Sequence, residues 1–159
     1  EFDLKAGVWT IPADRMKMNK AHVVPLAAAT IEILKRRWQI RTSDAGLVFS
    51  SPMSKPTLDA PDKPMSDMTM TKILRDAQVD DVTVHGFRSS FTDWAAETTD
   101  FPKEVVDKAL AHKVADKVEA AYRRTNFFER RRALMAQWAD FVSGKPTSAG
   151  RGRRNRSKH

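Results

Sequence analysis

The sequence predicts a mixed α/β fold that is mainly helical and carries a small β-hairpin or sheet on one side. Two short β-type runs lie within the first 26 residues. Beyond them, apolar residues recur at intervals of three and four, which is the spacing of an amphipathic helix. With 159 residues, of which 41% are apolar, the chain is long enough for one ordinary domain with a hydrophobic core.

The first 26 residues predict a β-hairpin with a basic tip. Val8–Ile11 is a short β-type run that Pro12 closes, and Val23–Leu26 is a second such run. The segment between them is polar and basic, which is typical of an exposed turn. Pro25 indicates an edge position for the second strand, because proline cannot donate a hydrogen bond to a ladder.

The rest of the chain predicts helices separated by one long loop. The loop covers residues 50–63, which are rich in Ser, Pro and Asp. Ser66 and Asp116 are placed to cap helices, and Pro102 is suited to a first helical turn. In the helix after residue 85 we expect a buried face of Phe87, Phe91, Trp94 and Ala95. The expected helices cover about residues 27–41, 66–77, 86–98, 102–110, 116–122 and 126–142.

The domain organisation is expected to be one folded domain over residues 1–143 and a basic, disordered tail over residues 144–159. The net charge of +8 favours a polyanionic partner such as nucleic acid. Residues 151–158 contribute five of the positive charges, so the charge says less about the folded domain. The chain begins at Glu1, in what resembles a strand end and a turn, and we interpret it as an N-terminally truncated piece of a longer protein.

Several classes of function are excluded. The chain has no cysteine, which rules out disulfides, thiol catalysis and a Cys-based zinc site, and which fits a reducing cytosol. It contains no apolar run approaching the roughly 18 residues of a membrane span. No acidic cluster accompanies a histidine in a recognisable ligand spacing, so no metal site is expected.

A set of cationic residues accompanies the only tyrosine. His85 and Arg88 are three apart at the expected start of a helix, whose partial positive charge favours a bound anion. His112 follows, and Tyr122 comes ten positions later. Each residue alone fits a structural role: a hydrogen-bonded histidine, a surface arginine, a helix-end histidine and a half-buried tyrosine. Together they suggest a site where tyrosine attacks a phosphate.

In their order and spacing these motifs resemble those of the tyrosine recombinases, the phage-type integrase family, over about residues 2–143. That family carries H-x-x-R, then a leucine, a small residue and a histidine, then a tyrosine about ten residues on. The matching residues are His85-Gly86-Phe87-Arg88, Leu110-Ala111-His112 and Tyr122. Ala111 stands where glycine is usual. The hairpin region resembles the branch carried by prophages and genomic islands.

One departure from the family is large. Its first catalytic arginine lies upstream of the hairpin, and no residue of this chain corresponds to it. The family's N-terminal DNA-binding domains are missing as well. The chain therefore resembles the C-terminal part of a catalytic domain, and we expect it to be impaired when alone.

The resemblance implies that Tyr122 attacks a DNA phosphodiester, forming a 3'-phosphotyrosine and a free 5'-hydroxyl, followed by strand exchange that integrates or excises a mobile element. Arg88 and His112 would donate to phosphate oxygens. His85 would take the tyrosine proton or donate to the phosphate. Lys17 would protonate the leaving 5'-oxygen, with Lys20 as its competitor for that role. Neither a cofactor nor a metal is implied.

The implied partner is double-stranded DNA at attachment sites, with a homotetramer on DNA for the full-length protein, in the bacterial cytoplasm at the nucleoid and not at a membrane. Arginines at positions 123, 124 and 130–132 flank the tyrosine and either contact the DNA backbone or form the polar face of a surface helix. Phe141 and Val142 are candidates for contact with a neighbouring protomer. The candidates for DNA binding are Arg15, Lys20, Lys113, Arg123 and Arg124.

Two alternative functions stay open. A type IB topoisomerase would use the same chemistry to relax one duplex. The other alternative is not an enzyme but a DNA-binding or assembly module without catalytic activity, because the first catalytic arginine is absent.

Overall fold

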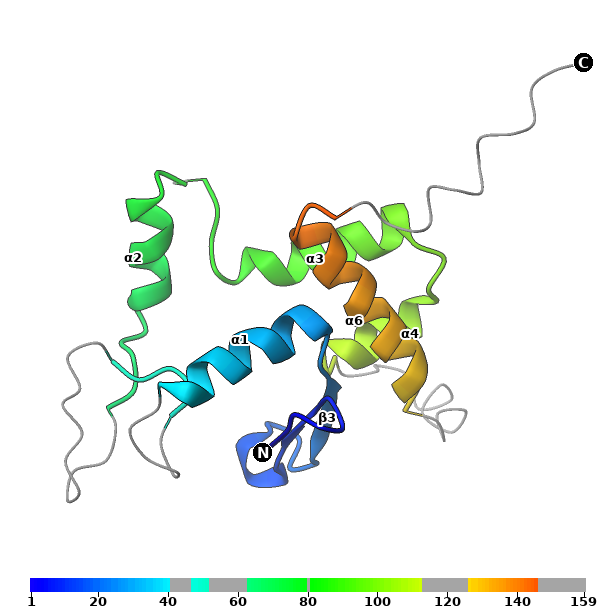
Figure 1. Cartoon of the computed structure of the whole chain (residues 1–159). Helices are drawn as coiled ribbons and strands as arrows, with labels where there is room; N and C mark the ends of the chain where they lie inside the picture. Colours follow the sequence, from blue (N-terminus) through cyan, green and yellow to red (C-terminus); the bar gives the residue numbers. More distant parts are fainter. Residues whose placement is uncertain (41–46, 52–62, 80, 113–125, 146–159) are drawn as a thin grey trace, which may run out of the picture. The chain divides into compact units, whose positions relative to one another are not determined.

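The computed structural model describes residues 1–40, 47–51, 63–79, 81–112 and 126–145 of the chain (Figure 1). These residues form five α-helices and one three-stranded antiparallel sheet, which confirms the predicted mixed, mainly helical fold. The chain divides into two compact units. The first unit combines Glu1–Ile31 with Thr98–His159, and the second unit is Glu32–Glu97.

The sheet of the first unit contains β1 (Phe2–Asp3), β2 (Val8–Ile11) and β3 (His22–Pro25), in that order. The turn from β1 to β2 passes through Gly7, whose φ of +65° suits a residue without a Cβ. The predicted hairpin is β2 and β3, and its tip contains the short 3-10 helix Ala13–Arg15. β3 is an edge strand ending at Pro25, as expected for a residue that cannot donate to a ladder.

Among the described residues, two helices lie wholly within the first unit. α4 (Lys103–Ala109) begins directly after Pro102, and α6 (Phe128–Val142) packs on both α4 and β3 (Figure 1). The Asn126 side chain starts α6 by accepting a hydrogen bond from the backbone N–H of Phe128 at 3.0 Å. Their core consists of buried apolar side chains from both helices and from the end of the hairpin: Leu26, Val105, Val106 and Leu134.

The second unit contains α2 (Thr69–Asp76) and α3 (Gly86–Thr98), while α1 (Ala28–Gln39) begins in the first unit and continues into the second. These helices confirm three predicted ones. The part of the second unit that the structure describes buries Leu34, Phe91, Trp94 and Ala95. Arg37 holds the chain after α1 by donating from Nε to the carbonyl of Val48 at 3.0 Å.

One expectation about burial is wrong. Phe87 was placed on the buried face of α3 but is 49% exposed, because it lies in the first turn, ahead of the buried positions. Phe141 and Val142, the candidates for contact with a neighbouring protomer, are 49% and 59% exposed at the last turn of α6. The expected helix over residues 116–122 and most of the tail lie outside the described residues. Within the described part of the chain, no helix is long and apolar enough to cross a membrane.

Candidate active site

His112 is held by a specific backbone turn at the end of α4. The N–H of His112 donates to the carbonyl of Asp107 at 2.9 Å, and the N–H of Ala111 donates to that of Lys108 at 3.3 Å. Ala111 has a φ of +53°. This pair of bonds around a left-handed residue is the Schellman motif, in which glycine is usual at the left-handed position. The turn therefore explains both the place of His112 and the small residue before it.

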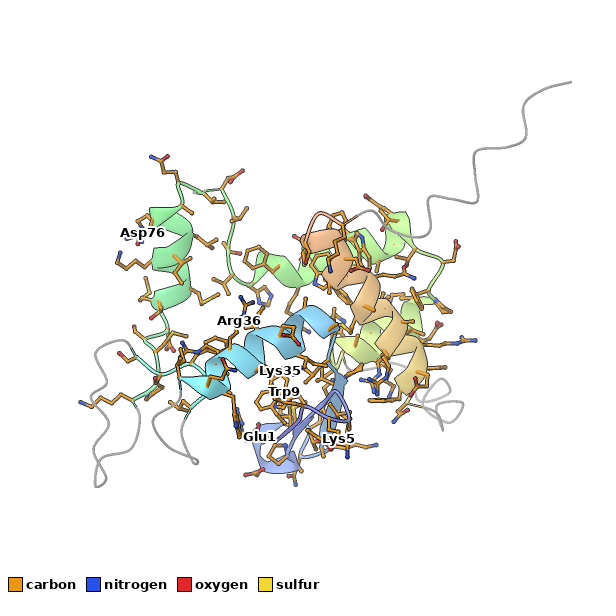
Figure 2. All side chains as sticks on the ribbon, in the orientation of Figure 1. Glu1, Lys5, Trp9, Lys35, Arg36 and Asp76 are labelled. Carbon is orange, nitrogen blue, oxygen red and sulfur yellow. The ribbon has the colours of Figure 1, made fainter. Side chains whose placement is uncertain are left out.

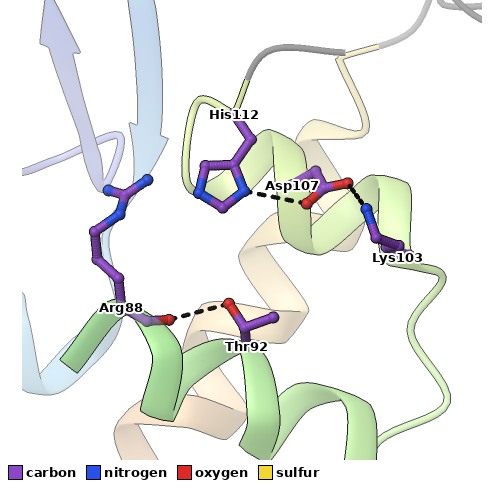
Figure 3. Close-up of polar contacts among 5 residues, drawn as sticks. All are labelled: Arg88, Thr92, Lys103, Asp107 and His112. Carbon is purple, nitrogen blue, oxygen red and sulfur yellow. Dashed lines mark hydrogen bonds and ion pairs between the residues drawn. The ribbon is translucent and has the colours of Figure 1, made fainter. Parts of the chain in front are cut away.

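The side chain of His112 is oriented by Asp107, one turn back on α4. Nδ1 of His112 lies 3.2 Å from Oδ1 of Asp107, and Nζ of Lys103 donates to Oδ2 at 2.6 Å (Figure 3). Partial burial acts to raise the pKa of Asp107, but the hydrogen bonds from Lys103 and His112 outweigh it and leave that pKa below its ordinary value. Asp107 is therefore ionised at neutral pH, and Nε2 of His112 is the nitrogen that remains for a substrate.

His85 and Arg88 lie at the start of α3, in the second unit, and both are exposed. The Thr83 hydroxyl accepts a hydrogen bond from the N–H of Gly86 at 3.0 Å and so caps the helix. A Cβ at Gly86 would meet that hydroxyl oxygen at 3.3 Å, so glycine leaves room for the cap. The carbonyl of Arg88 accepts a hydrogen bond from the hydroxyl of Thr92 at 3.0 Å (Figure 3).

The tip of the hairpin carries three of the predicted residues. Lys17 and Lys20 are exposed there. Arg15 is also exposed, but its guanidinium pairs with the carboxylate of Glu1. The other oxygen of that carboxylate accepts a hydrogen bond from the indole of Trp9 at 3.0 Å (Figure 2). An arginine held this way can bind a DNA phosphate only by leaving Glu1, so Lys17 and Lys20 are the freer cations of the tip.

The predicted site residues are divided between the two units, and some lie outside the described residues. Lys17 and His112 belong to the first unit, while His85 and Arg88 belong to the second. Tyr122 lies outside the described residues, as do Lys113, Arg123 and Arg124. Among the described residues, no group of three or more His, Asp or Glu side chains is arranged to hold a metal ion.

Comparison with known proteins decides the family. The sequence profile of the Phage integrase family matches residues 1–129, which include the hairpin, both histidine motifs and Tyr122. The chain belongs to the phage integrase family. The predicted membership in the tyrosine recombinases is thereby confirmed.

Curated relatives of this integrase-family chain agree. Prophage integrase IntA of Escherichia coli strain K12 is 37% identical over 143 residues, which cover 89% of this chain and 33% of that protein. The integrase of Enterobacteria phage P4 is 30% identical over 158 residues, covering 89% of this chain and 34% of that protein. The chain spans about a third of the length of these relatives. No solved structure matches it.

Sequence reasoning missed one residue of this integrase-family chain. Arg131 was grouped with the arginines that contact DNA or cover a surface helix, but it is 3% exposed. It is the buried charged residue of the described part of the chain. The signal that was available is its place on α6, three residues before the fully buried Leu134, which puts both on the core-facing side of the helix.

Proposed function

We propose that this chain is the catalytic part of a site-specific DNA recombinase in which Tyr122 is the nucleophile. The Oη atom of Tyr122 would attack a DNA phosphorus, forming the O–P bond of a 3'-phosphotyrosine as the P–O5' bond breaks. A 5'-hydroxyl from the same or a partner duplex would then reverse the step. The bond energy is kept in the protein–DNA ester, so the chemistry consumes no nucleotide.

The observation that carries the proposal is the orientation of His112, ten positions before Tyr122. Because Asp107 engages Nδ1, Nε2 is the nitrogen left to contact a non-bridging phosphate oxygen, and it donates to that oxygen when the ring is an imidazolium. The exposed guanidinium of Arg88 suits the same phosphate, since it can donate two parallel hydrogen bonds and keeps its charge. These donors would stabilise the charge that builds up as the phosphorus becomes five-coordinate.

The remaining groups would move protons. A free phenol has a pKa near 10, so only about one tyrosine in a thousand is ionised at pH 7, a handicap of roughly 4 kcal/mol. His85 would accept the phenolic proton. Lys17, at the exposed tip of the hairpin, would give a proton to the leaving O5'. Loss of one charge-assisted phosphate contact, worth about 1.5 to 3 kcal/mol, should slow the step by roughly 10- to 150-fold.

The same proposal covers DNA binding, the DNA substrates and the assembly of the longer protein. Lys20, Lys113, Arg123 and Arg124 would bind the DNA backbone, which makes binding dependent on salt. The substrates would be duplex attachment sites of a mobile element, brought together by a tetramer of the longer protein in the bacterial cytoplasm. Phe141 and Val142, exposed at the end of α6, suit a contact with a neighbouring protomer.

The deciding experiment traps the covalent step. The chain is incubated with a pool of lightly nicked duplexes of random sequence, so that the short leaving strand diffuses away after attack. Denaturing gels then show whether DNA is attached to the protein, and sequencing of the attached strands gives the site. The proposal predicts an adduct that is lost in Tyr122→Phe.

Other outcomes of this experiment would favour a different function. If neither this chain nor a longer one that carries an arginine upstream of the hairpin forms an adduct, the catalytic assignment fails. Salt-sensitive DNA binding without an adduct would then favour a binding or assembly module. An adduct accompanied by plasmid relaxation, but not by strand exchange between two copies of the captured site, would favour a topoisomerase.

A further inference from the structure

Arg131 is a charged side chain that the fold buries. Burial lowers the pKa of its guanidinium, and among the described residues no carboxylate pairs with it. Removing a cation from water is costly unless its donors are satisfied, and an apolar side chain would fill the space without that cost. Leu134, one turn further along α6, is fully buried in this way. The charge at position 131 therefore needs an explanation in its contacts.

The guanidinium joins two segments that are far apart in the sequence. Nε donates to the carbonyl of Asn126 at 2.9 Å. Nη1 donates to the carbonyl of Val23, 108 residues away, at 2.7 Å. The guanidinium carbon also lies 5.7 Å from the centroid of the Phe128 ring, which favours a cation. Both acceptors are main-chain oxygens, so the bridge fixes the positions of two backbones.

These two backbone segments lie close in sequence to the proposed nucleophile and to the proposed general acid. Asn126 comes four residues after Tyr122, at the entry to α6. Val23 lies in β3, the strand that leads away from the hairpin tip with its exposed lysines. We infer that Arg131 is a positioning residue, which holds the segment that follows the nucleophile against the strand that follows the general acid. The inference rests on the proposed function and deepens it.

The chemistry explains why such a bridge would matter. As Tyr122 Oη bonds to phosphorus, O5' leaves with the electron pair of the P–O5' bond and takes a proton from Lys17. The acid must therefore stay in register with the phosphate that the nucleophile attacks. A displacement of about 1 Å between such groups can cost about 100-fold in rate. Arg131 would limit that displacement without touching the DNA.

The test compares leaving groups. A duplex of the captured sequence is made twice, with either oxygen or sulfur at the bridging 5' position of the cleaved bond. A thiol has a pKa of about 8.5 and leaves as a thiolate, so the sulfur duplex needs no general acid. Lys17→Ala should therefore be slow on the oxygen duplex and should recover on the sulfur duplex.

Arg131→Met should show the same pattern. We expect its adduct formation to fall about 100-fold on the oxygen duplex, and the sulfur duplex should recover at least about tenfold of that loss. Arg131→Lys keeps the charge but offers a single nitrogen, so it should lie between Met and Arg on the oxygen duplex. It also carries the test if Arg131→Met does not fold.

Two controls separate positioning from folding and from charge. Leu134→Ala removes packing from the same helix and leaves the bridge, so any loss should be equal on both duplexes. Lys145→Met removes an exposed positive charge at the end of α6 and should leave both rates unchanged.

Two results would overturn the inference. Equal losses on both duplexes for Arg131→Met and Arg131→Lys, as for Leu134→Ala, would reduce Arg131 to a core residue while the proposed function stood. If the unsubstituted protein forms no adduct that depends on Tyr122, the function and the inference fail together.

Discussion

Nδ1 of His112 lies 3.2 Å from Oδ1 of Asp107, so a carboxylate holds the histidine that the family motif marks. An ionised carboxylate only accepts hydrogen bonds, and the proton between the two groups therefore sits on Nδ1. Nε2 can then donate to a phosphate only when the ring is an imidazolium. Asp107 therefore fixes which nitrogen of His112 is left for a phosphate, which gives the aspartate a part in the proposed chemistry.

Asp107→Asn should slow adduct formation about tenfold or more, because the imidazolium loses a charge-assisted partner. The amide can still accept from Nδ1, so the ring should keep its place. The rate of adduct formation on the captured duplex is the measurement. Asp140→Asn, which removes a half-exposed charge from α6, is the matched control. Equal rates for Asp107→Asn and the unsubstituted chain would exclude this part for Asp107.

Ala111→Gly should stabilise the chain by about 1 kcal/mol, because a left-handed backbone strains alanine but not glycine. The φ of +53° at Ala111 is the reason for this expectation. Urea unfolding measures the change. Ala109→Gly, at the last residue of α4, is the control and should destabilise by about 1 kcal/mol, since its backbone is helical. A loss of stability in both variants would contradict the turn described for His112.

Thr83→Val should destabilise the chain by about 1 kcal/mol, because valine keeps the shape of threonine but cannot cap α3. The same substitution at Thr92, whose hydroxyl donates back to the carbonyl of Arg88, should change stability by less than about 0.5 kcal/mol. Urea unfolding of the two variants provides the comparison. Similar values for both would mean that the Thr83 cap does not set the start of α3.

Stability should fall as the pH drops below about 6.5, the ordinary pKa of histidine. Burial first, and then the charge of Arg131 on α6, lower the pKa of His22 in the folded chain; Lys108 on α4 adds to this, while the backbone of Ala109 opposes it. The unfolded chain therefore takes up a proton at His22 before the folded chain does, and acid favours unfolding.

The measurement for His22 is the unfolding free energy between pH 7.5 and pH 5 in the unsubstituted chain and in His22→Gln. The variant should show a weaker decline towards acid, because glutamine does not titrate. The other histidines are common to both proteins and cancel in the difference. Parallel declines would show that His22 keeps its ordinary pKa.

Local rules predicted most of the described fold. The hairpin followed from two β-type runs around a basic segment, and α1, α3, α4 and α6 followed from apolar spacing. These signals work because each element buries one face. They failed at the start of α3: Phe87 has the spacing of a core residue, but it lies in a terminal turn that its unit leaves exposed.

The chemistry of the site was less accessible from the sequence. The order of the motifs identified His112, but the part of Asp107 depends on a turn that brings positions 107 and 112 together. Arg131 was misjudged because its charge suggested contact with solvent or DNA. One of its two hydrogen-bond acceptors, the carbonyl of Val23, lies 108 residues away. A side-chain hydrogen bond to a distant backbone carbonyl leaves no pattern in the spacing of residues along the sequence.

The bridge made by Arg131 has a consequence for how the chain tolerates sequence change. Its acceptors are carbonyl oxygens, which every type of amino acid carries, so Val23 can vary while its hydrogen bond to Arg131 persists, and Asn126 is constrained only through the side chain that accepts from the N–H of Phe128. Only the donor is irreplaceable. A saturation mutagenesis map of the chain should therefore show a sensitive position at 131 and a permissive one at 23. Position 131 is not expected to covary with the positions of its acceptors.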